Sequence, residues 1–188
     1  MNYYKKGFLK DTAKKYMGYN TLSKSFINEA TKIESKKKAI YFEEFKYDIF
    51  LSHAYDDKEI IFGLYCDLTY NFNFNVYVDW MVDPSLNRGN VTRENANFLR
   101  KRMKQCKSLI YVVSSNSQNS DWMQWETGYF DGLKGKVAIL PILGDFDSTF
   151  DEQEYLKLYP IIDRRTATVF INRLEGIPSY KKLNEWIV

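Results

Sequence analysis

The chain has 188 residues, of which 45% are hydrophobic and 17% aromatic, which predicts one domain with a terminal extension. It has no run of 18 apolar residues and no signal-like apolar segment near its start, so we expect a cytoplasmic protein without a membrane span. The net charge is +3 and uneven, since residues 1–46 hold 11 lysines against 5 acidic residues. These lysines are spread along the segment, which indicates a solvated helical surface and argues against nucleic acid or membrane as a partner.

Cysteine and histidine are too few to build the common metal and catalytic sites. Cys66 and Cys106 lie in predicted helices without metal-ligand spacing, so we expect two free thiols in a reducing compartment. His53 is the single histidine, which gives a zinc site or a Ser–His–Asp triad little support. We therefore expect no metal.

The first half of the chain predicts helix, strand, helix and strand in turn. Residues 8–34 carry a weak helical spacing, and residues 47–52 ("YDIFLS") form a short apolar strand. Residues 58–72 follow as a helix and residues 75–79 ("NVYVD") as a second strand, after which Pro84 marks a loop. In the N-terminal pattern, the apolar positions that we expect to pack onto the domain or onto a second copy are Leu22, Phe26, Ile27, Ala30 and Ile33.

The second half continues the alternation. A helix capped by Asn90 or Thr92 extends to about residue 105, and residues 108–114 ("SLIYVVS") form a third strand, apolar enough to be covered on both faces. The next helix begins at Ser120 or Asp121, reaches about Leu133 and is ended by Gly135. The remaining elements are strands at residues 136–142 and 167–172 and a closing helix at residues 179–187.

This alternation predicts an α/β fold of the flavodoxin-like type, with a five-stranded parallel sheet, helices on both faces and a helical N-terminal extension. In such sheets, ligands bind at the carboxyl ends of the strands. No glycine-rich phosphate loop follows the first strand, and no nucleophile elbow is present. The polar pairs at the predicted strand ends are Ser52–His53, Asp79–Trp80 and Ser114–Ser115.

Glu126 is the residue that the helical pattern leaves unexplained. On its predicted helix it shares a face with Trp122, Tyr129 and Leu133. A carboxylate among aromatic side chains needs a buried partner, a place at the rim or a chemical role. A structural salt bridge to Arg88 or Arg93 is one alternative, and catalysis is the other.

Three ordered segments, "YDIFLSHAYDD", "NVYVDW" and "CKSLIYVVSSNSQNSDWMQWE", resemble a Toll/interleukin-1 receptor (TIR) domain over residues 46–188. The stretch "WMQWETGYF" resembles the fuller form of the motif in bacterial members. Residues 1–45 lie outside the resemblance and make up the expected extension. The loop "WMVDPSLNRGN" departs from the Arg-Asp…Pro-Gly signature of the animal receptors, which argues against an animal-type adaptor role.

The resemblance implies a function. Many TIR domains cleave NAD at the nicotinamide–ribose bond and yield ADP-ribose or a cyclic or variant ADP-ribose signal, and Glu126 holds the position of the family's catalytic residue. It also implies NAD as substrate with no cofactor, bacterial defence signalling, self-association through TIR contacts and a separate effector or sensor protein as partner. The alternatives are a non-enzymatic TIR interaction module and a nucleotide-sensing binder without turnover.

The chemistry agrees with a single carboxylate. Most glycosidases need a second carboxyl group to protonate the leaving alcohol, whereas nicotinamide leaves NAD as a neutral molecule. A lone carboxylate then stabilises the cationic ribose, and apolar walls strengthen that interaction. His53 has loop capping as its structural alternative, and Trp80 has core packing. The candidates for substrate binding are Ser52, His53, Asp79, Trp80, Asp83 and Arg88.

Overall fold

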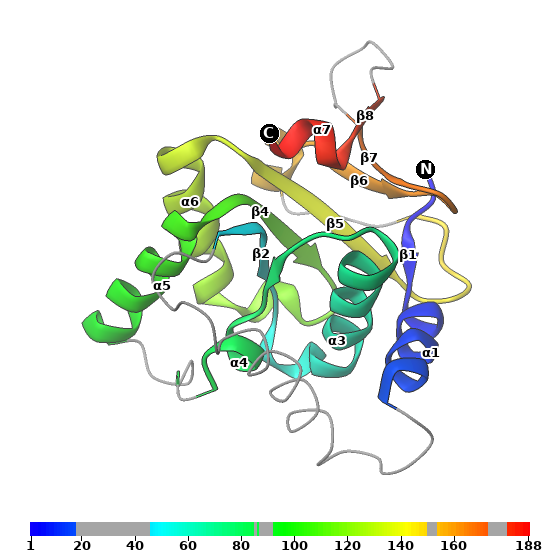
Figure 1. The fold of residues 1–188 in the computed structure, drawn as a ribbon, viewed down its shortest axis with the longest axis horizontal. Helices are drawn as coiled ribbons and strands as arrows, with labels where there is room; N and C mark the ends of the chain where they lie inside the picture. Colours follow the sequence, from blue (N-terminus) through cyan, green and yellow to red (C-terminus); the bar gives the residue numbers. More distant parts are fainter. Residues whose placement is uncertain (18–45, 85, 87–91, 150–153, 173–179) are drawn as a thin grey trace.

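The computed structural model describes residues 1–17, 46–84, 86, 92–149, 154–172 and 180–188 (Figure 1). Within these residues, the centre is an eight-stranded sheet in which five neighbouring strands run parallel. The α/β class and the five-stranded parallel sheet are therefore confirmed. In spatial order, the parallel strands are β3 (Val76–Tyr77), β2 (Tyr47–Ser52), β4 (Cys106–Val113), β5 (Val137–Leu143) and β6 (Ile161–Arg164).

The fifth parallel strand is not the segment that the sequence pattern indicates. That segment contains β7 (Val169–Asn172), which runs antiparallel to β6, and β8 (Tyr180–Lys182) continues antiparallel beside β7. The physical reason is the short connection from β6 to β7, because a parallel partner needs a crossover of a dozen or more residues. The carboxyl end of β5 also pairs in parallel with β1 (Tyr4–Lys5).

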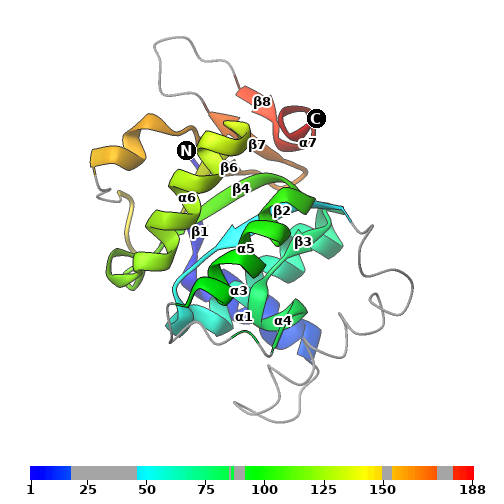
Figure 2. The same cartoon turned by 90° about the vertical axis from the view of Figure 1, so that its left-hand side faces the viewer.

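Helices cover both faces of the sheet, as predicted. Ile49 and Leu51 of β2 face one hydrophobic core, and Phe50 between them faces the other, as the two-residue period of a strand requires. Figure 2 shows the second face, with two helices side by side across the sheet. The helices of the first core are α1 (Lys6–Met17), α3 (Lys58–Cys66) and α7 (Leu183–Ile187), and those of the second are α5 (Arg93–Gln105) and α6 (Asp121–Lys134).

Short helical turns modify the predicted boundaries. The predicted helix at residues 58–72 is α3 followed by a π turn, η2 (Asp67–Asn71). The second strand is shorter than predicted, because the chain turns at Val78 into the short helix α4 (Asp79–Val82). The remaining turns of 3₁₀ type are η1 (Tyr55–Asp57), η3 (Ser117–Asn119) and η4 (Glu154–Leu158).

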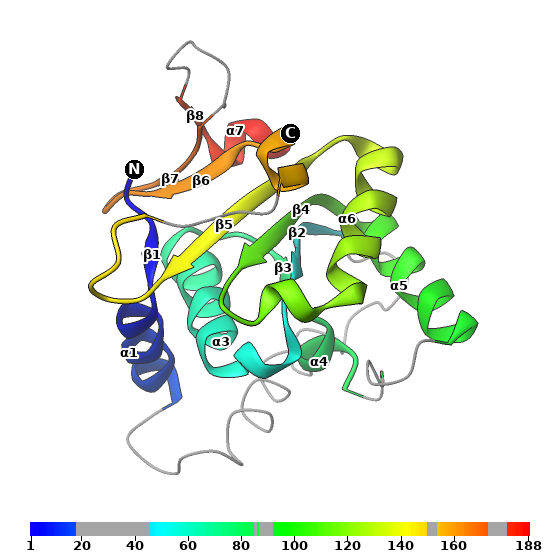
Figure 3. The same ribbon diagram turned by 180° about the vertical axis from the view of Figure 1, so that it is seen from behind.

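The N-terminal extension is described only over residues 1–17. Helix α1 lies beside α3, and its residues Leu9 and Ala13 are fully buried (Figures 1 and 3). The five apolar positions predicted to pack further along lie outside the described residues, and the domain division at residue 45 stays a prediction. No helix in the described part of the chain is both long and apolar enough to cross a bilayer.

Two predicted caps can be compared with the structure. Thr92 caps α5, where its Oγ accepts a hydrogen bond from the Asn95 amide at 3.2 Å. Helix α6 ends at Gly135, whose φ of 60° is left-handed, a conformation that a side chain disfavours.

We predict that Gly135→Ala lowers the free energy of unfolding by about 1 kcal/mol, because the new Cβ meets no neighbouring atom and only the backbone conformation is strained. The control is Gly132→Ala in the same helix, which also meets no atom and should stabilise by about 0.5–1 kcal/mol. Urea denaturation measures both. Shifts in the same direction would contradict the left-handed cap.

Candidate active site

Glu126 lies on the side of α6 that faces the sheet, and its side chain has no exposed surface. Its buried neighbours on the helix are Met123, Thr127 and Phe130, at the spacing of one helical face. The expected face was only partly right, because Leu133 is 38% exposed and does not share the burial of Glu126.

The carboxylate of Glu126 is bound by the end of the neighbouring strand. Ser52 is the last residue of β2, and its hydroxyl donates to Glu126 Oε2 at 2.6 Å. Both residues have zero exposed area. A hydroxyl bond to a carboxylate is charge-assisted and helps to offset the cost of burying the charge. The structure therefore brings together two residues that the sequence placed at the end of the first strand and on the helix after the third strand.

Glu126 also affects an adjacent tyrosine. Burial raises the pKa of Tyr111 on β4, and the neighbouring Tyr155 and the negative charge of Glu126 raise it further. Tyr111 therefore stays a neutral phenol. Arg88, one suggested salt-bridge partner of Glu126, lies outside the described residues, and within them no ion pair joins Glu126 to Arg93.

His53 connects the end of β2 to the start of α4. Its Nδ1 lies 3.0 Å from the carbonyl oxygen of Leu51, and its Nε2 lies 3.1 Å from Nε1 of Trp80. Because the indole N–H can only donate, Nε2 accepts and the ring proton sits on Nδ1, which donates to Leu51. The imidazole is then neutral. A second proton on Nε2 would break the Trp80 bond and pair with Asp79, whose Oδ1 lies 3.5 Å away.

Residues that the sequence analysis did not select surround these side chains. Asp57, in the turn after His53, accepts hydrogen bonds from the Ser114 hydroxyl and, at 2.7 Å, from the Asn116 amide. The ammonium of Lys58 lies 3.8 Å from the ring centre of Tyr55 and 5.8 Å from that of Trp80. The available signal was the run "YDDK", which places charges directly after the polar end of the first strand.

Asp83 is held by a different set of contacts. Arg102 of α5 binds it with two hydrogen bonds, Nε to Oδ2 at 2.8 Å and Nη2 to Oδ1 at 2.7 Å, and the Tyr77 hydroxyl donates to Oδ2 at 3.0 Å. Burial lowers the pKa of Arg102, but hydrogen bonds and charge from Asp83 outweigh it and the net shift is upward. These contacts favour a structural role, and substrate binding by Asp83 stays a prediction.

The end of β2 thus carries Ser52, which binds a buried carboxylate, and His53, a neutral imidazole bonded to an indole. The carboxylate can stabilise a developing positive charge on a bound molecule. Within the described ranges, no group of three or more histidine, cysteine or acidic side chains is placed to hold a metal ion.

We predict that Arg102→Leu lowers the free energy of unfolding by about 3–5 kcal/mol, because it leaves the Asp83 carboxylate buried without its cation. The control is Lys101→Leu at the adjacent, exposed position of α5, which should change stability by less than about 0.5 kcal/mol. Thermal and urea unfolding of both variants measure the difference. Equal stabilities of the two variants would mean that the Arg102–Asp83 ion pair does not stabilise the fold.

Comparison with known proteins supplies the family. No family model matches the chain. It is 45% identical over 148 residues to the probable 3' cyclic ADP-D-ribose synthase ThsB' of Bacillus cereus (strain MSX-D12), which covers 78% of this chain and 72% of that protein. It is 32% identical over 100 residues to the putative cyclic ADP-D-ribose synthase TIR2 of Cytobacillus dafuensis, which covers 53% of this chain and 26% of that protein. With the ordered motifs and the parallel α/β fold, this similarity shows that the chain belongs to the TIR domain family.

Proposed function

We propose that the chain cleaves NAD at the nicotinamide–ribose bond and forms a cyclic ADP-ribose signal or a related ADP-ribose product. The observation that carries the proposal is the fully buried Glu126 carboxylate, held by Ser52 at the carboxyl end of the parallel sheet. The names of the two relatives, both cyclic ADP-D-ribose synthases, support the same reaction.

The proposed mechanism uses Glu126 as an electrostatic partner of the ribose. As the bond from the ribose carbon to nicotinamide breaks, its electron pair neutralises the pyridinium ring and the ribose becomes cationic. The carboxylate stabilises this cation without needing a second carboxyl group to protonate the leaving group. For a cyclic product, a hydroxyl of the same molecule bonds to the ribose carbon and gives up its proton to the carboxylate.

Burial of Glu126 favours a cyclic product over simple hydrolysis. A site without water gives an internal hydroxyl an advantage over a water molecule. The same burial restricts access, because the side chains that cover Glu126 must move before a ribose can contact it. Trp80 of α4 and Lys58, the first residue of α3, are our candidates for the side chains that rearrange.

Further parts of the proposal concern assembly and context. We propose that self-association through TIR contacts promotes the open state, and that NAD is consumed as a substrate with no separate cofactor. A distinct sensor or effector protein, defence signalling and a cytoplasmic location complete the proposal. Ser52, His53, Asp79 and Trp80 remain our candidates for contacts with NAD.

We predict that Glu126→Gln keeps the fold and lowers nicotinamide release from NAD by about 10²–10³-fold, because the amide is nearly isosteric but lacks the negative charge. The matched control is Glu94→Gln, which makes the same change at an exposed position of α5 and should retain wild-type activity. Liquid chromatography measures nicotinamide, and mass spectrometry identifies the ADP-ribose product.

Both variants should be melted first and assayed well below their transitions, in the same assembly state as wild type. If folded Glu126→Gln stays within about threefold of the wild-type rate, Glu126 is not the catalytic carboxylate. If wild type releases no nicotinamide in any assembly state, the non-enzymatic interaction module replaces the enzyme.

A further inference from the structure

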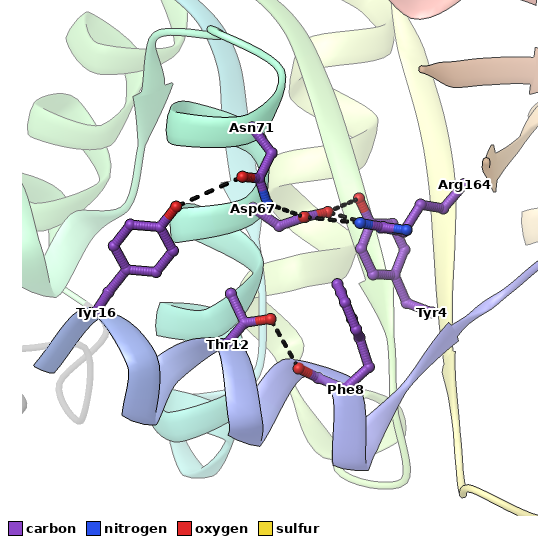
Figure 4. Close-up of polar contacts among 7 residues, drawn as sticks. All are labelled: Tyr4, Phe8, Thr12, Tyr16, Asp67, Asn71 and Arg164. Atoms are coloured by element: carbon purple, nitrogen blue, oxygen red, sulfur yellow. Dashed lines mark hydrogen bonds and ion pairs between the residues drawn. The ribbon is translucent and has the colours of Figure 1, made fainter. Parts of the chain in front are cut away.

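Asp67 is a buried point of attachment for the N-terminal segment. This residue of η2 has no exposed surface and accepts hydrogen bonds from the Tyr4 hydroxyl at 2.9 Å and from the Asn71 amide at 2.7 Å (Figure 4). Arg164, at the end of β6, binds both carboxylate oxygens at 2.9 and 3.0 Å. Burial, and then the negative charge of Asp67, raises the pKa of Tyr4 well above its usual range, so the phenol stays a donor.

Gly63 is a second point of attachment for the N-terminal segment, because it has no side chain and lets the α1 backbone approach α3. A Cβ on Gly63 would lie 2.0 Å from the carbonyl oxygen of Leu9 and 2.7 Å from its carbonyl carbon. The backbone of α1 therefore packs directly on α3, and no larger residue fits between the two helices. The opposing atoms are main chain, so a rotamer change cannot relieve the contact. Buried Leu9 and Ala13 fill the remaining contact from the α1 side.

The start of α1 reaches the edge of the sheet that carries the candidate active site. Because β1 runs parallel to β5, with Lys5 opposite Leu143, residues 5–7 emerge at the carboxyl ends of the strands. There the Lys5 ammonium donates to the Gly144 carbonyl at 3.2 Å. The Gly7 amide donates to Asp145 at 2.8 Å, and the Lys6 ammonium donates to the Ser115 hydroxyl at 3.1 Å.

The loop after β4 continues these contacts toward Glu126. Ser114 and Asn116 flank the residue that Lys6 contacts, and both donate to Asp57 of η1. Asp57 follows the Ser52–His53 end of β2, and Ser52 binds Glu126. These contacts, together with the short stretch of chain between Ser52 and Asp57, connect α1 to the Glu126 carboxylate.

We propose that β1 and α1 are a positioning element for the proposed NAD site, anchored at Gly63 and Asp67 and acting through Lys6 on the loop after β4. The inference rests on the proposed function for its catalytic consequence. Lys6 and Gly63 are positioning residues, since neither touches the carboxylate. A segment that only covers α3 would add stability but leave the turnover of each folded molecule unchanged.

The test is Gly63→Ala in the full chain, with Gly132→Ala as the matched control in α6. The first places a Cβ against the Leu9 backbone and the second meets no atom. We expect Gly63→Ala to increase amide hydrogen exchange in residues 4–17, 55–57 and 114–117. We also expect kcat to fall by about tenfold or more at a temperature well below the melting transition, whereas the control keeps its kcat.

The outcomes separate this inference from the proposed function. Unchanged exchange at residues 4–17 would show that Gly63 is not an anchor. Faster exchange there with unchanged kcat would show that α1 is only a cover, and either result overturns the proposal. If wild type itself releases no nicotinamide, the proposed function fails, and exchange at residues 55–57 and 114–117 then decides alone whether α1 holds these loops.

A second variant covers the case in which Gly63→Ala does not fold. Lys6→Met removes the ammonium that contacts Ser115 and leaves both anchors in place, so its melting temperature should match wild type. We expect faster exchange at residues 114–117 and a kcat/KM lower by at least about threefold. Lys14→Met, at an exposed position of the same helix, is the control and should change neither. Equal values for the two lysine variants overturn the role of Lys6.

Discussion

The hydrogen bond between Ser52 and Glu126 is the interaction around which the rest of the site is arranged. A carboxylate without exposed surface is stable only if polar groups replace its lost water. The parallel sheet supplies such a group because β2 ends directly beneath the second turn of α6. The Glu126 carboxylate therefore lies against protein groups at the end of a strand and is not exposed to solvent. A reaction that needs a negative charge beside a cationic ribose can use this environment.

Two other buried carboxylates have a related structural purpose. Asp83 joins the end of α4 to Arg102 of α5, and Asp67 joins the π turn after α3 to Arg164 of β6. In both cases an arginine binds the two oxygens together, a geometry that fixes direction as well as distance. Glu126 differs from both, since its contact to β2 is a hydroxyl and not a guanidinium. The two bidentate pairs support structural roles for the two aspartates.

The sequence predicted the alternation of strands and helices because apolar runs and caps are local signals. It missed β6 because a four-residue strand in an acidic, irregular segment has no periodicity of its own, and its partner β5 defines it. It placed Asp79 at a strand end because no local signal marks the short helix α4. Selection of Ser52, His53 and Glu126 as one group came from the family resemblance and the strand-end rule. Asp57 and Lys58 were missed because their partners, Ser114 and Trp80, are distant in sequence.

The contact between Gly63 and the α1 backbone constrains which residue can stand at this position in related sequences. In most helices glycine is less favourable than alanine, and alanine can replace it because no close backbone contact requires glycine there. Here the requirement comes from a second segment more than 50 positions earlier in the chain, because the α1 backbone occupies the space of a side chain. A relative that lacks α1 is free to place any small or large helix former at this position. The residue aligned with Gly63 therefore reports whether an N-terminal helix lies against α3, even where that helix is too divergent to align.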